Sequence, residues 1–157
     1  MRFDRRAMEV RVLDLQECPK MDVAIAAFVR GALASMSARI AAGELALPDR
    51  RSLLADYRGA VTKGLDAPVS THLLAGKRRA RTARGVLSGL LDDAAEYVSA
   101  TEQPYLRLVA ERIVQGNLAE RILRRVGRAE RRRRRDAIVD VYGELMHCLE
   151  ANTPWPG

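Results

Sequence analysis

Only one short stretch of this sequence alternates polar and apolar residues in the way that predicts a β-strand. Residues 8–13, MEVRVL, place Glu9 and Arg11 on one face, because successive side chains of a strand point to opposite sides. Pro19 ends any regular pairing. An independently stable sheet normally needs three or more strands. The chain must therefore fold mainly as helices, and the strand must find its partners elsewhere. The apolar face of this strand consists of Met8, Val10 and Val12.

The rest of the sequence carries apolar residues at steps of three and four, the spacing of one face of an α-helix. Residues 65–80 mix Pro, Gly, Ser and Thr and predict a loop or a broken helical turn. We expect a mainly α fold of five or six helices packed in one core, with the single N-terminal strand, and treat 1–157 as one helical domain. The expected helices cover residues 22–42, 48–64, 86–98, 101–116, 117–126 and 138–149.

Capping residues mark the ends of several of these helices. Asp22 is placed to start the first, and Thr101 can cap the fourth through its hydroxyl. Gly116 is a natural helix stop. Asn117 followed by Glu120 resembles a capping box, in which each side chain binds the other's backbone N–H.

A net charge of +7 raises the question of nucleic-acid binding. If residues 121–135 were one helix, its arginines would form a stripe able to follow a phosphate backbone. The alternative is a solvated linker, and the aromatic residues that stack on single-stranded bases are absent from this run. Nucleic acid is therefore the weaker expectation. The stripe would consist of Arg121, Arg124, Arg125, Arg128, Arg131, Arg132 and Arg135.

Two cysteines, Cys18 and Cys148, are too few for a disulfide framework of the secreted type, and no signal-peptide pattern precedes them. We expect a cytoplasmic location. The longest apolar run, 23–29, is shorter than the ~20 residues that cross a bilayer, so no membrane association is expected. His72 and His147 do not combine with these cysteines at a zinc-ligand spacing.

Glu9 and Arg11 project side by side about 7 Å apart along the strand. A carboxylate is a hard ligand for Mg²⁺, and a guanidinium can hold phosphoryl or carboxylate oxygens. The alternative interpretation is an exposed edge strand that its charges protect from pairing with other chains. Asp14, Glu17 and Cys18 could line the same cleft, but no neighbouring cation is evident that would activate the thiol, and a structural role is preferred.

Three stretches resemble glutamate-cysteine ligases of the second, bacterial type, which are carboxylate-amine ligases related to glutamine synthetase. These are MEVRVLDLQECPKMDVAIAAFVRGAL (8–33), YLRLVAERIVQGNLAERILRRVG (105–127) and VDVYGELMHCLEANTPW (139–155). The resemblance implies an ATP-dependent ligase of the glutathione pathway that works through an acyl phosphate. It implies Glu9 as a metal ligand, Arg11 as the catalytic residue that contacts the transferred phosphate or the acyl group, and ATP and Mg²⁺ as cofactors.

The family's fold also contains an antiparallel sheet that precedes this strand, and no such sheet is evident in the sequence. The resemblance therefore implies the C-terminal part of a larger α+β catalytic domain, from a truncated reading frame or a split subunit. Its expected partner is the missing N-terminal catalytic portion, and alone the chain should bind neither cofactor and be inactive. The alternatives are a small basic helical module that binds nucleic acid or a partner protein, and a homodimer paired through the orphan strand.

Overall fold

The structure is a computed structural model that describes residues 10, 13, 15–74 and 80–157. The predicted strand at residues 8–13, with Glu9 and Arg11, lies outside these residues except for Val10 and Leu13. Within the described part the chain contains six α-helices and three short 3-10 helices, so the mainly α prediction is confirmed. The described residues contain one isolated β-bridge, Pro68 with Thr82, and no strand. In order, the helices are α1 (Pro19–Ala41), α2 (Arg50–Lys63), η2 (Gly64–Asp66), α3 (Ala83–Ala94), η3 (Ala95–Tyr97), α4 (Gln103–Gln115), α5 (Leu118–Gly127), η4 (Arg131–Arg133) and α6 (Arg134–Ala151).

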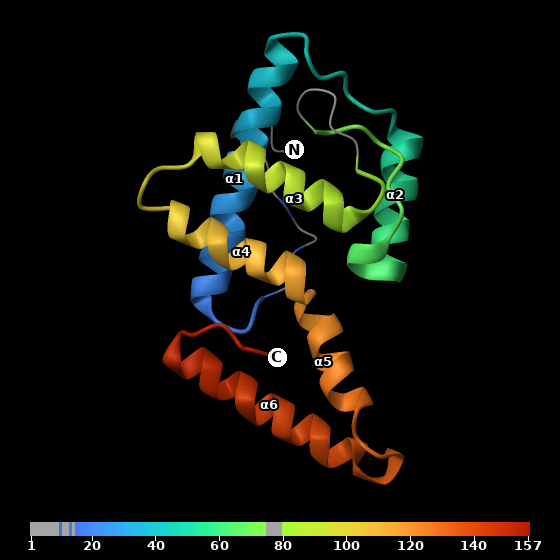
Figure 1. The fold of residues 1–157 in the computed structure, drawn as a ribbon, viewed down its shortest axis with the longest axis vertical. Helices are drawn as coiled ribbons and strands as arrows, with labels where there is room; N and C mark the ends of the chain where they lie inside the picture. Colours follow the sequence, from blue (N-terminus) through green and yellow to red (C-terminus); the bar gives the residue numbers. More distant parts are fainter. Residues whose placement is uncertain (1–9, 11–12, 14, 75–79) are drawn as a thin grey trace.

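The long helix α1 forms the centre of the fold, with α3 and α4 packed against it (Figure 1). Length and composition alone would let α1 cross a membrane, and it is the one described helix that passes that test. A core helix passes the same test, and α1 contributes Met21, Ala24, Phe28 and Ala32 to the main apolar cluster. A second, smaller cluster lies between α5, α6 and the C-terminal segment, around Val141, Cys148 and Trp155.

The start of α1 lies three residues before the predicted Asp22. Pro19 occupies the first helical turn, where its missing N–H costs nothing and its fixed φ suits a helix. The Asp22 carboxylate instead accepts a hydrogen bond from the Gln16 backbone N–H at 3.0 Å. Asp22 therefore fixes the segment that leads into the helix.

The helix α2 begins and ends where the sequence predicts, but it packs differently. Asp49 caps it by accepting from the Arg51 and Ser52 N–H groups, and Gly64 follows its last residue with φ +60°. None of its residues is buried. The apolar side chains expected in the core, among them Tyr57 and Val61, are largely exposed.

The Thr101 cap of the fourth helix is not formed. Glu102 is the N-cap residue of α4, and the Thr101 hydroxyl instead lies 2.9 Å from the Ser99 hydroxyl. The end of α4 is as predicted, with Gly116 at φ +105°. The capping box at the start of α5 is confirmed in both directions, since Asn117 accepts from Glu120 N–H at 2.8 Å and Glu120 accepts from Asn117 N–H at 3.1 Å.

Candidate functional site

Glu9 and Arg11 are the two residues predicted to bind metal and phosphate. Both lie outside the described residues, so their geometry stays a prediction. The structure does describe the segment after them. From Leu15 onward the chain runs into α1, and Glu17 lies six residues after Arg11. The contacts of Glu17 therefore show how the segment that leads away from the predicted strand is attached to the helices.

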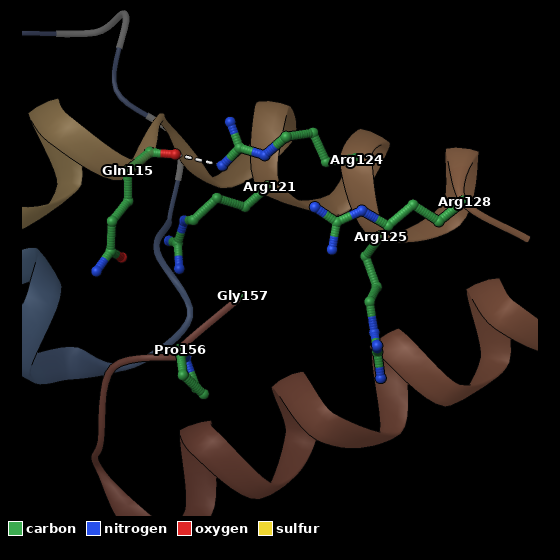
Figure 2. A pocket seen from close by; sticks show the side chains of 7 residues that line it. All are labelled: Gln115, Arg121, Arg124, Arg125, Arg128, Pro156 and Gly157. Atoms are coloured by element: carbon green, nitrogen blue, oxygen red, sulfur yellow. Dashed lines mark hydrogen bonds between the residues drawn. The ribbon is translucent and has the colours of Figure 1, made fainter.

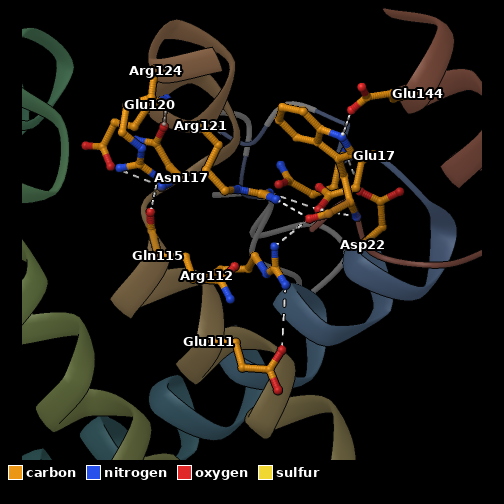
Figure 3. Close-up of polar contacts among 12 residues, drawn as sticks. Glu17, Asp22, Glu111, Arg112, Gln115, Asn117, Glu120, Arg121, Arg124 and Glu144 are labelled. Carbon is orange, nitrogen blue, oxygen red and sulfur yellow. Dashed lines mark hydrogen bonds and ion pairs between the residues drawn. The ribbon is translucent and has the colours of Figure 1, made fainter. Parts of the chain in front are cut away.

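Glu17 is buried and forms an ion pair with Arg121 of α5 (Figure 3). The Arg121 Nη2 donates to the Glu17 Oε1 at 2.9 Å, and the two side chains are 2% and 0% exposed. The local sequence places Arg121 in this position, because the capping box at Asn117 fixes the start of α5 one turn earlier. Loss of either member of a charge pair this well buried is strongly destabilising, since the remaining charge has no partner.

Trp155 of the C-terminal segment completes this cluster. Its carbonyl accepts from Arg121 Nη1 at 2.5 Å and from Arg112 Nη1 of α4 at 2.8 Å, and its backbone N–H donates to Glu17 at 3.3 Å. The Arg121 guanidinium lies 5.5 Å from the centroid of the Trp155 ring, within cation–π range. The indole N–H donates to Glu144 of α6 at 2.8 Å, and this bond is the main reason why the pKa of Glu144 is lowered.

Arg121 is paired with the buried Glu17 carboxylate, whereas the neighbouring Arg112 binds the Trp155 carbonyl and pairs with Glu111 at 3.6 Å. Burial lowers the pKa of Arg112, and the charge of Arg121 lowers it further. Within the described part of the chain, the Glu17 Oε2, the Arg112 Nε and the Arg121 Nε are buried without a hydrogen-bond partner. Both guanidiniums also line a largely apolar cavity of about 340 Å³ that Leu13 borders. We name Glu17, Arg112, Arg121 and Trp155 the anchor cluster.

The predicted arginine stripe is not one helix. The helix α5 ends at Gly127, and α6 begins at Arg134 after the short turn η4. Arg121 also faces inward, where it binds Glu17. The prediction that seven arginines form a stripe on one helix face is therefore wrong, because the chain reverses direction in the middle of the run (Figure 1).

Part of the run lines a second cavity, of about 330 Å³, between α5 and the C-terminal segment (Figure 2). Arg124 donates to the Gln115 carbonyl, and Arg125 forms an ion pair with Glu144 at 3.2 Å. Arg128 makes no side-chain hydrogen bond or ion pair within the described part of the chain. The remaining lining residues are Arg121, Pro156 and Gly157.

Neither cysteine has the surroundings of a reactive thiol. Cys18 and Cys148 are both buried and both free. Burial, and then the nearby charge of Glu17, raise the pKa of Cys148. No group of three or more His, Cys, Asp or Glu side chains that could hold a metal ion occurs among the described residues.

The sequence indicates the anchor cluster only in part. Glu17 follows the predicted strand, and Arg121 belongs to the predicted basic stripe. Sequence reasoning gives no role to Arg112 or Trp155. The one available signal for Trp155 is its isolation, because it is the single tryptophan of the chain and lies between two prolines.

Comparison with known proteins assigns the chain to a family. The family model for glutamate-cysteine ligase family 2 matches residues 2–144, a range that includes Glu9, Arg11, Glu17 and Arg121. An uncharacterized protein of Archaeoglobus fulgidus is 30% identical over 152 residues, which are 97% of this chain and 34% of the relative. The chain thus spans about a third of the length of this relative. No solved structure matches. On this evidence the chain belongs to glutamate-cysteine ligase family 2.

Proposed function

We propose that this chain is the C-terminal portion of an ATP-dependent carboxylate-amine ligase like the bacterial type 2 glutamate-cysteine ligases. The observation that supports the proposal best is that the family match covers the Glu9-x-Arg11 strand together with Glu17 and Arg121. The buried ion pair between the last two attaches the segment that follows the predicted strand to the helical core. The helical unit would then hold the strand in position for a sheet supplied by the rest of the enzyme.

The proposed reaction has two steps. A carboxylate oxygen of glutamate attacks the γ-phosphorus of ATP, and ADP leaves, so that an acyl phosphate is formed. The amine of the second substrate then attacks the acyl carbon, the C–O bond to phosphate breaks, and an amide and inorganic phosphate result. Such catalysis depends mainly on positioning and on stabilising the charge that develops on the phosphoryl oxygens.

Within this scheme Arg11 binds the oxygens of the transferred phosphoryl group, and its fixed fork of N–H donors suits that geometry. Glu17, which lies six residues after Arg11 in the sequence, is a positioning residue. Its bond to Arg121 holds the segment that follows Arg11 in place. The substrates would be glutamate and a second substrate that supplies the amine, such as cysteine. The product would be a dipeptide of the glutathione pathway. A cytoplasmic location agrees with the supply of ATP that this chemistry needs.

The described residues do not by themselves suit a magnesium ion. They contain no group of three or more His, Cys, Asp or Glu side chains that could hold one. Glu9 would be one ligand, and the others would have to come from the missing N-terminal portion or a separate subunit. We therefore expect neither ATP nor Mg²⁺ to bind to the isolated chain, and we expect the isolated chain to be inactive.

A segment exchange tests the proposal. In a family member with measured glutamate-cysteine ligase activity, the matching segment is replaced by this chain, and ADP formation is followed with glutamate and cysteine present together or singly. We expect ADP formation that requires both substrates. Glu9→Gln and Arg11→Gln should each reduce the rate by about a hundredfold or more. Glu96→Gln and Arg107→Gln, at exposed positions, are the matched controls and should leave it unchanged.

The proposal fails if a folded exchange protein is inactive, or if the Glu9 and Arg11 variants are as active as the controls. ADP formation by the 157-residue chain alone would contradict the part of the proposal that makes it dependent on a second portion. Circular dichroism on each protein separates loss of the fold from loss of the chemistry.

A further inference from the structure

The helix α6 carries an apolar face that nothing in the described part of the chain covers. Val141 and Cys148 point into the second core cluster and are buried. On the opposite side Val139, Tyr142, Met146 and Leu149 are each more than half exposed, and Ile138 is 44% exposed. Figure 1 shows α6 at the edge of the molecule, with α5 and the C-terminal segment on one side of it only. A contiguous exposed apolar patch of this kind marks an interaction surface.

The exposed residues form one stripe along the helix. Steps of three and four separate Val139, Tyr142, Met146 and Leu149, so these side chains lie above one another on the same face. Arg135 lies at the N-terminal end of this stripe and Glu150 at its C-terminal end. The face is thus apolar in the middle, basic at one end and acidic at the other.

This face is complementary to itself in one particular arrangement. If two copies of α6 cross antiparallel with the centre between Tyr142 and Gly143, Val139 of one copy meets Met146 of the partner subunit. In the same register Tyr142 meets Gly143 of the partner subunit, and Arg135 meets Glu150 of the partner subunit. The two charge pairs then close the apolar centre at both ends.

The C-terminal end of α6 carries an unfavourable charge for an isolated helix. The helix dipole favours acidic residues in the first turn and basic residues in the last. The first turn of α6 contains Arg135 beside the favourable Asp136, whereas its last turn contains Glu150 and no basic residue. Neither Arg135 nor Glu150 forms a side-chain hydrogen bond or ion pair within the described part of the chain. An antiparallel partner would bring opposite charge and an opposed dipole to each end.

Gly143 gives a further, independent indication. A glycine inside a helix destabilises it by roughly 1 kcal/mol relative to alanine. Space does not demand a glycine here, because a Cβ added at Gly143 would have no heavy atom within 4 Å. At the crossing point of two helices, however, the missing side chain lets the large ring of Tyr142 from the partner subunit lie close to the backbone.

We propose that this chain forms a symmetric homodimer through an antiparallel pair of α6 helices, centred between Tyr142 and Gly143. This interface involves neither the predicted strand nor the anchor cluster, and the proposal is independent of the ligase activity. It differs from pairing through the orphan strand, which would leave α6 exposed.

Sedimentation equilibrium of the 157-residue chain tests the dimer. Over a range of micromolar concentrations we expect a species of about twice the 17.4 kDa chain mass. Tyr142→Glu should weaken association by about a hundredfold or more, because it places two carboxylates in the apolar centre. Tyr57→Glu, at an exposed position of α2, is the matched control and should leave association unchanged.

Charge reversal provides the sharper test. Arg135→Glu and Glu150→Arg should each weaken association about tenfold, because each puts like charges together at both ends. The chain that carries both substitutions should associate like the original. Each single change improves the match of α6 to its own dipole, so a loss of association cannot come from a weaker helix.

Three outcomes would overturn the proposal. The first is a chain that stays monomeric at all concentrations, which would leave the α6 face to another partner, such as the remainder of the ligase. The second is a dimer that Tyr142→Glu does not weaken. The third is a double charge-reversal variant that associates no better than the single ones, since only the antiparallel register predicts that rescue.

Discussion

Glu17 and Arg121 are 104 residues apart in the sequence, and their charged groups meet at 2.9 Å with both side chains buried. This pair joins the segment after the predicted strand to α5. Its position links the stability of the helices to the attachment of the segment that follows the predicted strand.

Replacing Arg121 by Met should lower the free energy of unfolding by about 3–5 kcal/mol, because Glu17 would remain buried without its partner. Urea denaturation followed by circular dichroism measures this change. Arg107→Met, at an exposed position of α4, should change the free energy by less than about 0.5 kcal/mol. A loss below about 1 kcal/mol for the Arg121 variant would contradict the role given to the pair.

Replacing Trp155 by Phe keeps an aromatic ring and removes the indole N–H that binds Glu144. We expect a loss of about 1–3 kcal/mol, typical of a hydrogen bond to a charged acceptor. Glu144→Gln weakens the same bond, so the two changes combined should cost less than the sum of the single losses. Strict additivity in urea denaturation would show that this bond does not form.

Glu102 should make the stability dependent on pH in the acid range. Hydrogen bonds from the Ser99 hydroxyl, then from the Ser99 N–H, then from Arg30 lower the pKa of Glu102 from 4.5 to about 2. Because the pKa is lower in the folded state, this carboxylate stabilises the fold fully above pH 4.5 and loses its effect as the pH falls towards about 2.

The measurement compares the free energy of unfolding of the original chain and of Glu102→Gln across that range. The difference between the two should shrink as the pH falls from 4.5 towards about 2. Glu96→Gln, at an exposed position nearby, should differ little from the original chain at any pH. A difference between Glu102→Gln and the original that does not change with pH would rule out the lowered pKa.

Gly31 lies where α1 packs tightly against the end of α3. A Cβ at this position would lie 2.9 Å from the Val98 Cγ1 and 3.0 Å from the Ala94 carbonyl oxygen. Gly31→Ala should therefore destabilise the fold by about 1–3 kcal/mol. Gly127→Ala, where a Cβ meets nothing within 4 Å, should instead stabilise it by up to about 1 kcal/mol. If Gly31→Ala is as stable as the original chain in thermal denaturation, the two helices can move apart at no cost in free energy.

The sequence predicts those parts of the fold that depend on neighbouring residues. Asn117 and Glu120 are three residues apart, and their capping box arises from local geometry alone. Gly116 and Asp49 mark helix ends for the same reason. The start of α1 differs from the prediction because the Pro19 that stops a strand is also favoured in the first turn of a helix.

Contacts between distant residues could not be predicted in this way. Whether the apolar stripe of α2 is buried depends on which helices pack beside it, and its large apolar side chains are exposed. The same limit applies to the anchor cluster, since nothing in the sequence near Glu17 indicates that Arg121 and Trp155 come to it from the other end of the chain. The predicted site residues Glu9 and Arg11 stay a prediction.

The bond between the Trp155 N–H and Glu17 has a consequence for how this helical unit can be connected to other polypeptide. Because the chain enters α1 and leaves α6 at the same carboxylate, the entry and exit points of the unit are adjacent in space. A unit with this geometry can be inserted into a host protein, or circularly permuted by joining its two ends with a short linker, without moving any helix.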